Sequence, residues 1–196
     1  MSATAFPETV MASQAVFRAV MDAFSRPGEI KSLCPASAAP TPLSGTAAAL
    51  ALALLDHETA VWLDPALSER PPVADWIRMQ VGARVTTDPR EAAFAFIADP
   101  SRAPPFDAFC SGTAEYPDRS TTLILQIERF GTGERLLLTG PGIANARAFA
   151  SEPMPPDFAA RLAANRALYP RGIDVILVSP AAVAALPRSV SAVPEQ

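Results

Sequence analysis

The sequence predicts an α/β protein with three layers, α/β/α, built around a mixed sheet. Helical and strand patterns alternate along the 196 residues, and 49% of the residues are hydrophobic, which is enough for one core of ordinary size. A strand pair joined by a glycine-containing turn at residues 131–133 would supply the antiparallel pairing that makes the sheet mixed. No internal repeat or long linker divides the chain, so we expect one domain over residues 1–196.

The first half of the chain contains helical patterns separated by short strands. An opening helix presents one apolar stripe at helical spacing, formed by Val16, Phe17, Val20, Met21 and Phe24. It should end at residues 25–28, because proline disfavours helix in the residue before it and glycine tolerates a left-handed turn. The other elements predicted here are a strand at 29–33, a helix capped by Ser44 or Thr46 that runs to Leu55, a buried strand at 60–63 and a helix that begins at Pro71.

The second half is richer in strands. The clearest strand, at residues 121–127, is apolar and contains several β-branched residues. We expect it to form a hairpin with a strand at 135–139. The remaining predicted elements are a strand at 93–97, a helical turn at 106–109, a helix at 157–168, a buried strand at 173–178 and a short helix after Pro180.

Composition and charge exclude several classes of protein. The net charge is −4, from 20 acidic and 16 basic residues, and no basic run is present, so we expect no nucleic-acid partner. The longest apolar stretch, residues 47–55, is too short to span a bilayer, and the first residues do not resemble a signal peptide. Cys34 and Cys110 do not make a disulfide framework. These features predict a cytoplasmic protein with no membrane partner.

Few residues could perform catalysis. His57 is the only histidine and lies in a polar turn between two acidic residues, where exposure to solvent is expected. One histidine and two scattered cysteines do not suggest a metal centre. Lys31 is the only lysine, and its place in a weak, edge-like strand does not suit the Schiff base of a pyridoxal phosphate enzyme. We therefore predict no catalytic residue, no metal and no bound cofactor.

Two glycine-containing segments could bind a small anion. The segment 111–113 combines two hydroxyl groups with a flexible backbone, and the segment 140–142 follows a predicted strand, where open α/β sheets place ligands. Arginines elsewhere in the chain could supply positive charge. The alternative is that these glycines only form turns and the arginines only face solvent. The candidate ligand residues are Arg26, Ser111, Gly112, Thr113, Gly140, Gly142 and Arg171.

Asp174 interrupts an apolar strand. A carboxylate there is unfavourable unless it is paired. We expect a structural ion pair with Arg171 or with another arginine.

The balance of apolar and charged residues predicts association. The mean hydropathy is +0.19 and only 18% of the residues are charged, below the usual quarter. Apolar surface beyond the need of one core is typical of an interface, and a symmetric homodimer is the commonest closed assembly. We expect Trp76, Phe106 and Phe109 to lie at that interface, and Trp62 and Phe96 to lie in the core.

Several short strings, in a fixed order across nearly the whole chain, resemble the H subunit of the bacterial carbon–phosphorus lyase complex, a family of phosphonate metabolism. They lie at residues 17–18, 25–28, 59–63, 111–114, 122–126, 138–143, 169–174 and 186–188. Tyr169 stands where this family often has phenylalanine.

The resemblance implies a fold like a pyridoxal phosphate transferase domain of reduced size that lacks the cofactor lysine. It implies a homodimer that joins the G, I, J and K subunits of the complex. That assembly is implied to transfer an alkylphosphonate to the ribose C1′ of ATP with release of adenine, before a radical iron–sulfur step elsewhere cleaves the carbon–phosphorus bond. The resemblance implies no catalytic residue in this subunit.

Two other functions remain open from the residues alone. One is an independent small-molecule enzyme that uses Ser111, Glu115 or Asp118. The other is a stand-alone binding module for a phosphonate or a nucleotide. Turnover by the purified chain would favour the first, ligand binding without turnover the second, and neither without partner proteins would favour an assembly subunit.

Overall fold

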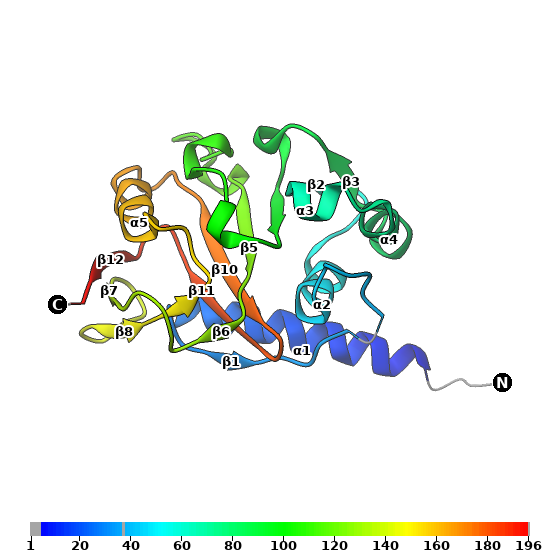
Figure 1. The fold of residues 1–196 in the computed structure, drawn as a ribbon, viewed down its shortest axis with the longest axis horizontal. Coiled ribbons are helices and arrows are strands. Elements are labelled where there is room, and N and C mark those ends of the chain that lie inside the picture. The colour runs from blue at the N-terminus through cyan, green and yellow to red at the C-terminus, as the bar shows by residue number, and fades with distance from the viewer. Residues whose placement is uncertain (1–4, 37, 196) are drawn as a thin grey trace.

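The computed structural model describes residues 5–36 and 38–195. Within these residues the fold is mixed α/β, with a central seven-stranded sheet (Figure 1). Its strands are β1 (Lys31–Ser32), β2 (Ala60–Leu63), β3 (Arg84–Thr86), β4 (Phe94–Ile97), β5 (Thr122–Gln126), β10 (Asp174–Ser179) and β11 (Ala182–Leu186). Their spatial order is β1-β11-β10-β5-β4-β2-β3. The strands from β10 to β3 pair in parallel, whereas β11 pairs antiparallel with both β10 and β1.

Helices from the first half of the chain cover one face of this sheet. They are α1 (Ala5–Ser25), α2 (Gly45–Leu54), α3 (Pro65–Ser68) and α4 (Pro71–Val81). Ser44 caps α2 by accepting a hydrogen bond from the backbone N–H of Ala47 at 3.1 Å, as the sequence predicts. The alanine-rich α2 lies buried against α1 and the sheet, where Phe96, Ile124 and Ile176 face it.

The other face carries one helix, several single turns of 3₁₀ helix and a second small sheet. The helix is α5 (Phe158–Ala167), and the turns are η1 (Pro89–Glu91), η2 (Pro100–Arg102), η3 (Phe106–Ala108) and η4 (Pro117–Arg119). The small sheet has the order β12-β7-β8, from β7 (Leu136–Thr139), β8 (Arg147–Phe149) and β12 (Ser191–Pro194), beside a two-strand pair of β6 (Arg129–Phe130) and β9 (Ser151–Glu152). The predicted three layers are thus present, but strands complete one outer layer.

The predicted hairpin between residues 121–127 and 135–139 is wrong. β5 lies in the middle of the central sheet, where β4 and β10 occupy both of its hydrogen-bonding edges in parallel. β7 instead pairs antiparallel with β8 and β12. The sheet is still mixed, because β11 supplies the antiparallel pairing.

The short helix predicted after Pro180 is also wrong. Residues 182–186 form β11, which pairs with β10 through a tight turn. Their alanines favour a helix by propensity, but β11 is almost completely buried between β1 and β10, and this tertiary pairing decides the structure. The sequence pattern gave no indication of α3 or β3.

The opening helix is confirmed, but its single apolar stripe is not. Val16 and Val20 are buried against the sheet, whereas the side chains of Phe17 and Met21 are 48% and 51% exposed. Figure 1 shows α1 running along one side of the molecule and extending beyond the neighbouring helices. Among the described helices, none is long and apolar enough to cross a bilayer.

Candidate functional site

A cavity of about 560 Å³ opens at the edge of the central sheet where the parallel strands begin. It lies between η3 and α5, and residues that lead into β5 and β10 line it. Its walls are mainly apolar, with a few polar groups among them. The residues that matter for its chemistry are Arg90, Phe106, Ser111, Gly112, Arg161 and Leu168.

The opposite edge, where the parallel strands end, is closed by structural hydrogen bonds. Asp64 follows β2 and accepts hydrogen bonds from the backbone N–H groups of Leu67, Ala98 and Asp99. Burial raises the pKa of this carboxyl group, although the three donors oppose the shift. Gln126, at the end of β5, is likewise bonded to the backbone of the loop before α2. The usual ligand edge of an open α/β sheet is therefore occupied by the protein itself.

The predicted ligand segment at 111–113 does reach the cavity. At the start of the segment, Cys110 bonds to Thr121 and the carbonyl of Ser111 accepts a hydrogen bond from Gly172 at 2.9 Å. At its end, the N–H of Thr113 donates to the carbonyl of Tyr116 at 3.2 Å, so both ends are held. Gly112 has φ +73°, and a Cβ there would lie 2.9 Å from the carbonyl oxygen of Pro117. Only glycine fits this turn. The N–H groups of Ser111 and Gly112 have no protein partner among the described residues.

Two arginines that sequence reasoning did not select line the same cavity. The side chain of Arg161, on α5, is only 15% exposed. Its Nε donates to Asp157 at 2.7 Å, and its Nη1 donates to the carbonyls of Ala103 and Pro104 at 3.0 and 2.8 Å. Arg90 donates to the carbonyl of Asp107 at 3.2 Å. Nothing in their sequence context distinguishes them from surface arginines.

Asn165 builds the wall between α5 and β10. Its side-chain amide exchanges two hydrogen bonds of 2.9 Å with the backbone N–H and carbonyl of Ile173. The amide is buried and makes the two hydrogen bonds that a neighbouring strand would make with the backbone just before β10. It therefore fixes the distance between α5 and the sheet, and with it the width of the cavity.

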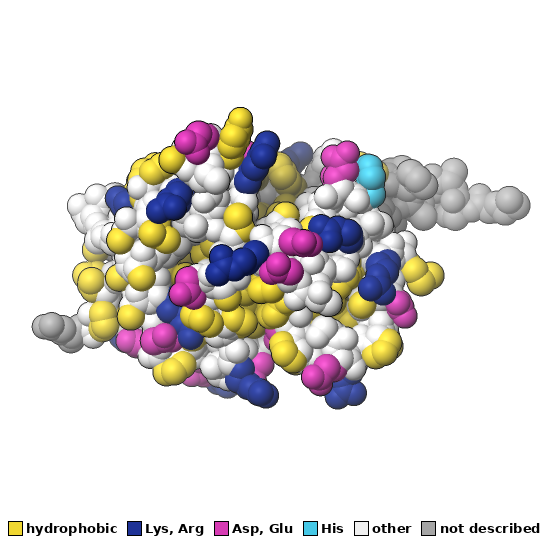
Figure 2. Space-filling view, turned by 90° about the horizontal axis from the view of Figure 1, so that it is seen from above, with side chains coloured by type: hydrophobic (Ala, Val, Ile, Leu, Met, Phe, Trp, Pro, Cys, Tyr) yellow, Lys and Arg dark blue, Asp and Glu magenta, His cyan; other side chains and the backbone are white. Residues whose placement is uncertain are grey.

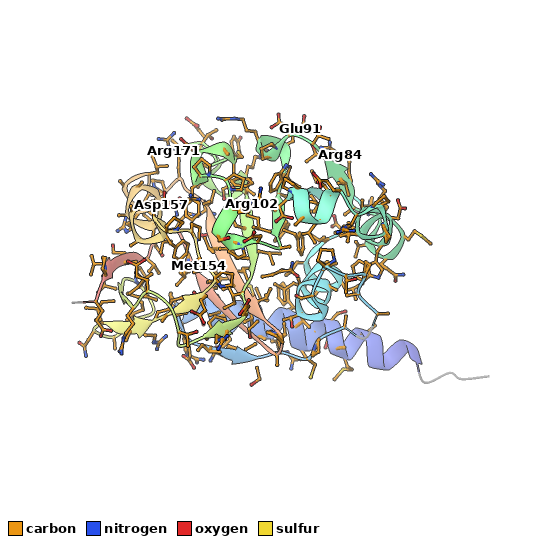
Figure 3. The ribbon with its side chains drawn as sticks, in the orientation of Figure 1. Arg84, Glu91, Arg102, Met154, Asp157 and Arg171 are labelled. Atoms are coloured by element: carbon orange, nitrogen blue, oxygen red, sulfur yellow. The ribbon has the colours of Figure 1, made fainter. Side chains whose placement is uncertain are left out.

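The seven candidate residues do not form one site. Ser111 and Gly112 line the cavity, and Thr113 lies beside them in a turn closed by Tyr116. Arg171 is exposed on the loop between α5 and β10, at the upper edge of Figure 3, and does not line the cavity.

The other three candidates do not line the cavity. Gly142 packs so closely that a Cβ would lie 2.3 Å from the carbonyl oxygen of Ser25, and Gly140 packs against Ser189. Arg26 forms an ion pair with Asp22 one turn earlier in the helix. For Gly140 and Gly142 the close packing gives a structural reason for glycine.

Asp174 pairs with Arg188 rather than with Arg171. The carboxylate accepts from the backbone N–H of Arg188 at 2.8 Å and from its Nε at 3.1 Å. The same guanidinium also donates to the carbonyl of Pro117 and to the hydroxyl of Ser120. The expectation of a structural pair with another arginine is therefore confirmed.

The polar groups of the cavity lining are guanidinium, carboxyl, thiol, hydroxyl, amide and backbone groups. Its lining contains no histidine or lysine, and the thiol of Cys110 donates to the carbonyl of Arg119. His57 is exposed on the turn after α2. Among residues 5–36 and 38–195, no group of three His, Cys, Asp or Glu side chains could hold a metal ion.

Charge on this side of the molecule is mixed. Figure 2 looks onto the upper edge of Figure 1, and shows basic and acidic side chains interspersed with apolar areas. No continuous patch of one sign covers the visible face. The electrostatics suit a small ligand or a protein partner better than a polyanion.

The described residues define a mixed α/β fold with a cavity at the edge of the sheet where the parallel strands begin. Residues 4–193 match the family model of the bacterial phosphonate metabolism protein (PhnH), and the chain belongs to that family. It is 46% identical over 185 residues to the alpha-D-ribose 1-methylphosphonate 5-triphosphate synthase subunit PhnH of Rhizobium meliloti (strain 1021), covering 94% of this chain and 92% of that protein. It is 33% identical over 179 residues to the putative C-P lyase subunit protein HtxG of Stutzerimonas stutzeri, covering 90% and 83%.

Proposed function

We propose that this chain is the H-type subunit of a carbon–phosphorus lyase core complex in phosphonate catabolism. In that role it supports transfer of an alkylphosphonate to the ribose C1′ of ATP with release of adenine, and it performs no catalysis alone. Membership of the PhnH family supports the proposal, as do two relatives that are both described as subunits.

A role in assembly is supported by the apolar side chains exposed on the outer side of α1. Four large apolar side chains on this one helix are between 48% and 62% exposed: Val10, Met11, Phe17 and Met21. Beside them, a groove of about 590 Å³ runs between α1, α2 and the segment after β1, and Leu52 at its rim is 37% exposed. Such a concentration of apolar surface is typical of a protein interface.

We assign this α1 surface, defined by Val10, Met11, Phe17 and Met21, to a second copy of the chain. A long helix that projects from the molecule can lie antiparallel to its own copy about a two-fold axis, which buries the same side chains twice. The remaining surface would then bind the G, I, J and K subunits in the cytoplasm.

None of the three residues that the sequence suggested for the interface belongs to the α1 surface. Phe109 is 2% exposed and belongs to the core, where its ring meets the edge of Trp62. Phe106 lines the cavity, and Trp76 is partly buried against the core.

We further propose that the fold resembles a pyridoxal phosphate transferase domain of reduced size and that the chain binds no pyridoxal phosphate. Lys31, the only lysine, forms ion pairs of 2.6 Å with Asp22 and with Glu29. The hydrogen bond with Asp22, followed by that with Glu29, raises the pKa of Lys31. A Schiff base needs the neutral amine, so both partners oppose its formation.

Incubation with pyridoxal phosphate and borohydride reduction should therefore leave Lys31 unmodified. Intact-mass measurement and peptide mapping would check this result. The variant Lys31→Arg serves as the control for reaction at the N-terminal amine. A stoichiometric adduct on Lys31 that disappears in the control would refute the proposal.

Assays of the purified chain, alone and with its partners, test the proposed function. We expect no release of adenine from ATP and methylphosphonate by the chain alone. We expect adenine release by the reconstituted complex, and its loss when this chain is omitted. Turnover by the chain alone would instead support the independent enzyme that uses Ser111, Glu115 or Asp118.

A further inference from the structure

We propose that the cavity between η3 and α5 binds a small organic oxyanion, a molecule with one apolar ring or chain and one phosphonate, phosphate or carboxylate group. The subunit role proposed above assigns no ligand to this chain, so the ligand site and the subunit role can be tested independently. Three parts of the cavity favour such a ligand: a preorganised guanidinium, a pair of free backbone donors and an apolar wall.

Arg161 is the preorganised guanidinium. Three hydrogen bonds fix its Nε and Nη1, two of them to the backbone carbonyls of Ala103 and Pro104. Its Nη2 has no partner among the described residues, although the side chain is only 15% exposed and lines the cavity. This Nη2 is not among the buried atoms without a partner, so it is open to the solvent of the cavity, and an anionic oxygen is a stronger acceptor for a guanidinium than water.

Ser111 and Gly112 present the backbone donors. Their N–H groups are consecutive, lack protein partners among the described residues and belong to a segment held at both ends. The left-handed conformation of Gly112 is of the kind that turns successive N–H groups toward one anion. The hydroxyl of Ser111 has no hydrogen bond within the described chain and can add a further donor.

The rest of the cavity is apolar and fits an uncharged group. Phe106, Leu168 and Ile173 line it, and the ring of Phe106 is held edge-on against Phe158 at a centroid distance of 6.3 Å. The volume of about 560 Å³ lies within the usual range for small-molecule sites. An inorganic anion would leave most of this apolar surface in contact with water.

The local charge limits how many negative charges the ligand carries. Arg161 is already paired with Asp157, and the lining also includes Asp107, whose backbone carbonyl accepts a hydrogen bond from Arg90. The cavity is therefore close to electrically neutral in total. It suits a ligand with one or two negative charges, and disfavours a triphosphate.

Titration of the ¹⁵N-labelled full-length chain with phenylphosphonate tests this proposal. We expect saturable shifts of the Ser111 and Gly112 amides with a dissociation constant below about 1 mM. Benzoate should bind at the same amides. Benzyl alcohol lacks the anion and methylphosphonate lacks the ring, so each should bind about tenfold or more weakly. AMP and ATP extend the series, and ATP should be the weaker of the two.

A matched pair of variants on α5 locates the site. Ala164 is exposed and lines the cavity, whereas its neighbour Ala163 is exposed and does not. Ala164→Phe should fill the cavity and abolish the shifts, and Ala163→Phe should leave them unchanged. The proposal is overturned by an absence of binding, by equal binding to Ala164→Phe, or by methylphosphonate binding as tightly as phenylphosphonate.

Discussion

Replacing Arg188 with methionine is expected to lower the free energy of unfolding by about 2–4 kcal/mol. The side chains of Arg188 and Asp174 are only 15% and 18% exposed. Without the guanidinium, the Asp174 carboxylate would keep a single backbone donor in a mostly buried position. The carbonyl of Pro117 and the hydroxyl of Ser120 would also lose their partner.

This large effect follows from the position of Arg188 in the fold. Its guanidinium joins the start of β10 to the segment around η4, which lies directly behind Gly112. Loss of Arg188 should therefore loosen the cavity wall at Gly112 as well as the sheet. Faster amide hydrogen exchange at residues 111–121 would report this local effect.

Urea unfolding followed by circular dichroism measures the effect on stability. Arg129→Met is the matched control, because the Arg129 side chain is 61% exposed and its pairs with Glu128 and Glu152 lie at the surface. We expect a change within about 0.5 kcal/mol for that control. An Arg188→Met variant as stable as the wild type would show that the pair does not hold the two segments together.

The double variant Phe17→Asp, Met21→Asp is expected to abolish the proposed self-association and to leave a monomer in solution. Two carboxylates placed at the centre of an apolar interface would weaken self-association by about 100-fold or more. Both side chains are about half exposed, at 48% and 51%, and do not belong to the buried core, so the fold should persist.

Light scattering after size exclusion at low micromolar concentration measures this change. The wild-type chain should have twice the 20.6 kDa mass of one chain, and the double variant should have that mass once. Met79→Asp is the control, because Met79 on α4 is 81% exposed and lies away from the α1 surface. A wild-type monomer, or a double variant that remains dimeric, would remove α1 from the interface.

The sequence predicted local elements well because their signals are local. The proline and glycine after Ser25, the cap at Ser44 and the β-branched strand before Ile127 each depend on neighbouring residues. Pairing between strands depends on distant residues, and the hairpin of β5 with β7 was assigned to the wrong partner for that reason. Residues 182–186 show the same dependence on distant residues. The helix preference of their alanines is too weak to outweigh strand pairing with β10.

The site was only half predictable. Ser111 and Gly112 stood out because hydroxyl and glycine residues before a strong strand are a local signal. Arg161 and Arg90 did not, since their role depends on carbonyls and a cavity formed by segments far away in the sequence. The exposed side of α1 was missed because Phe17 and Met21 lie next to the buried residues Val16 and Val20 at helical spacing. Spacing alone does not show which part of the helix surface the rest of the protein covers.

Co-expression of the tagged chain with the G, I, J and K subunits tests whether the chain is a subunit of the complex. We expect all four subunits to co-purify with the tagged chain through affinity and size-exclusion steps, in fixed ratios measured by native mass spectrometry. A tagged chain that purifies alone, while the other four subunits assemble and release adenine without it, would show that the chain is not a required subunit.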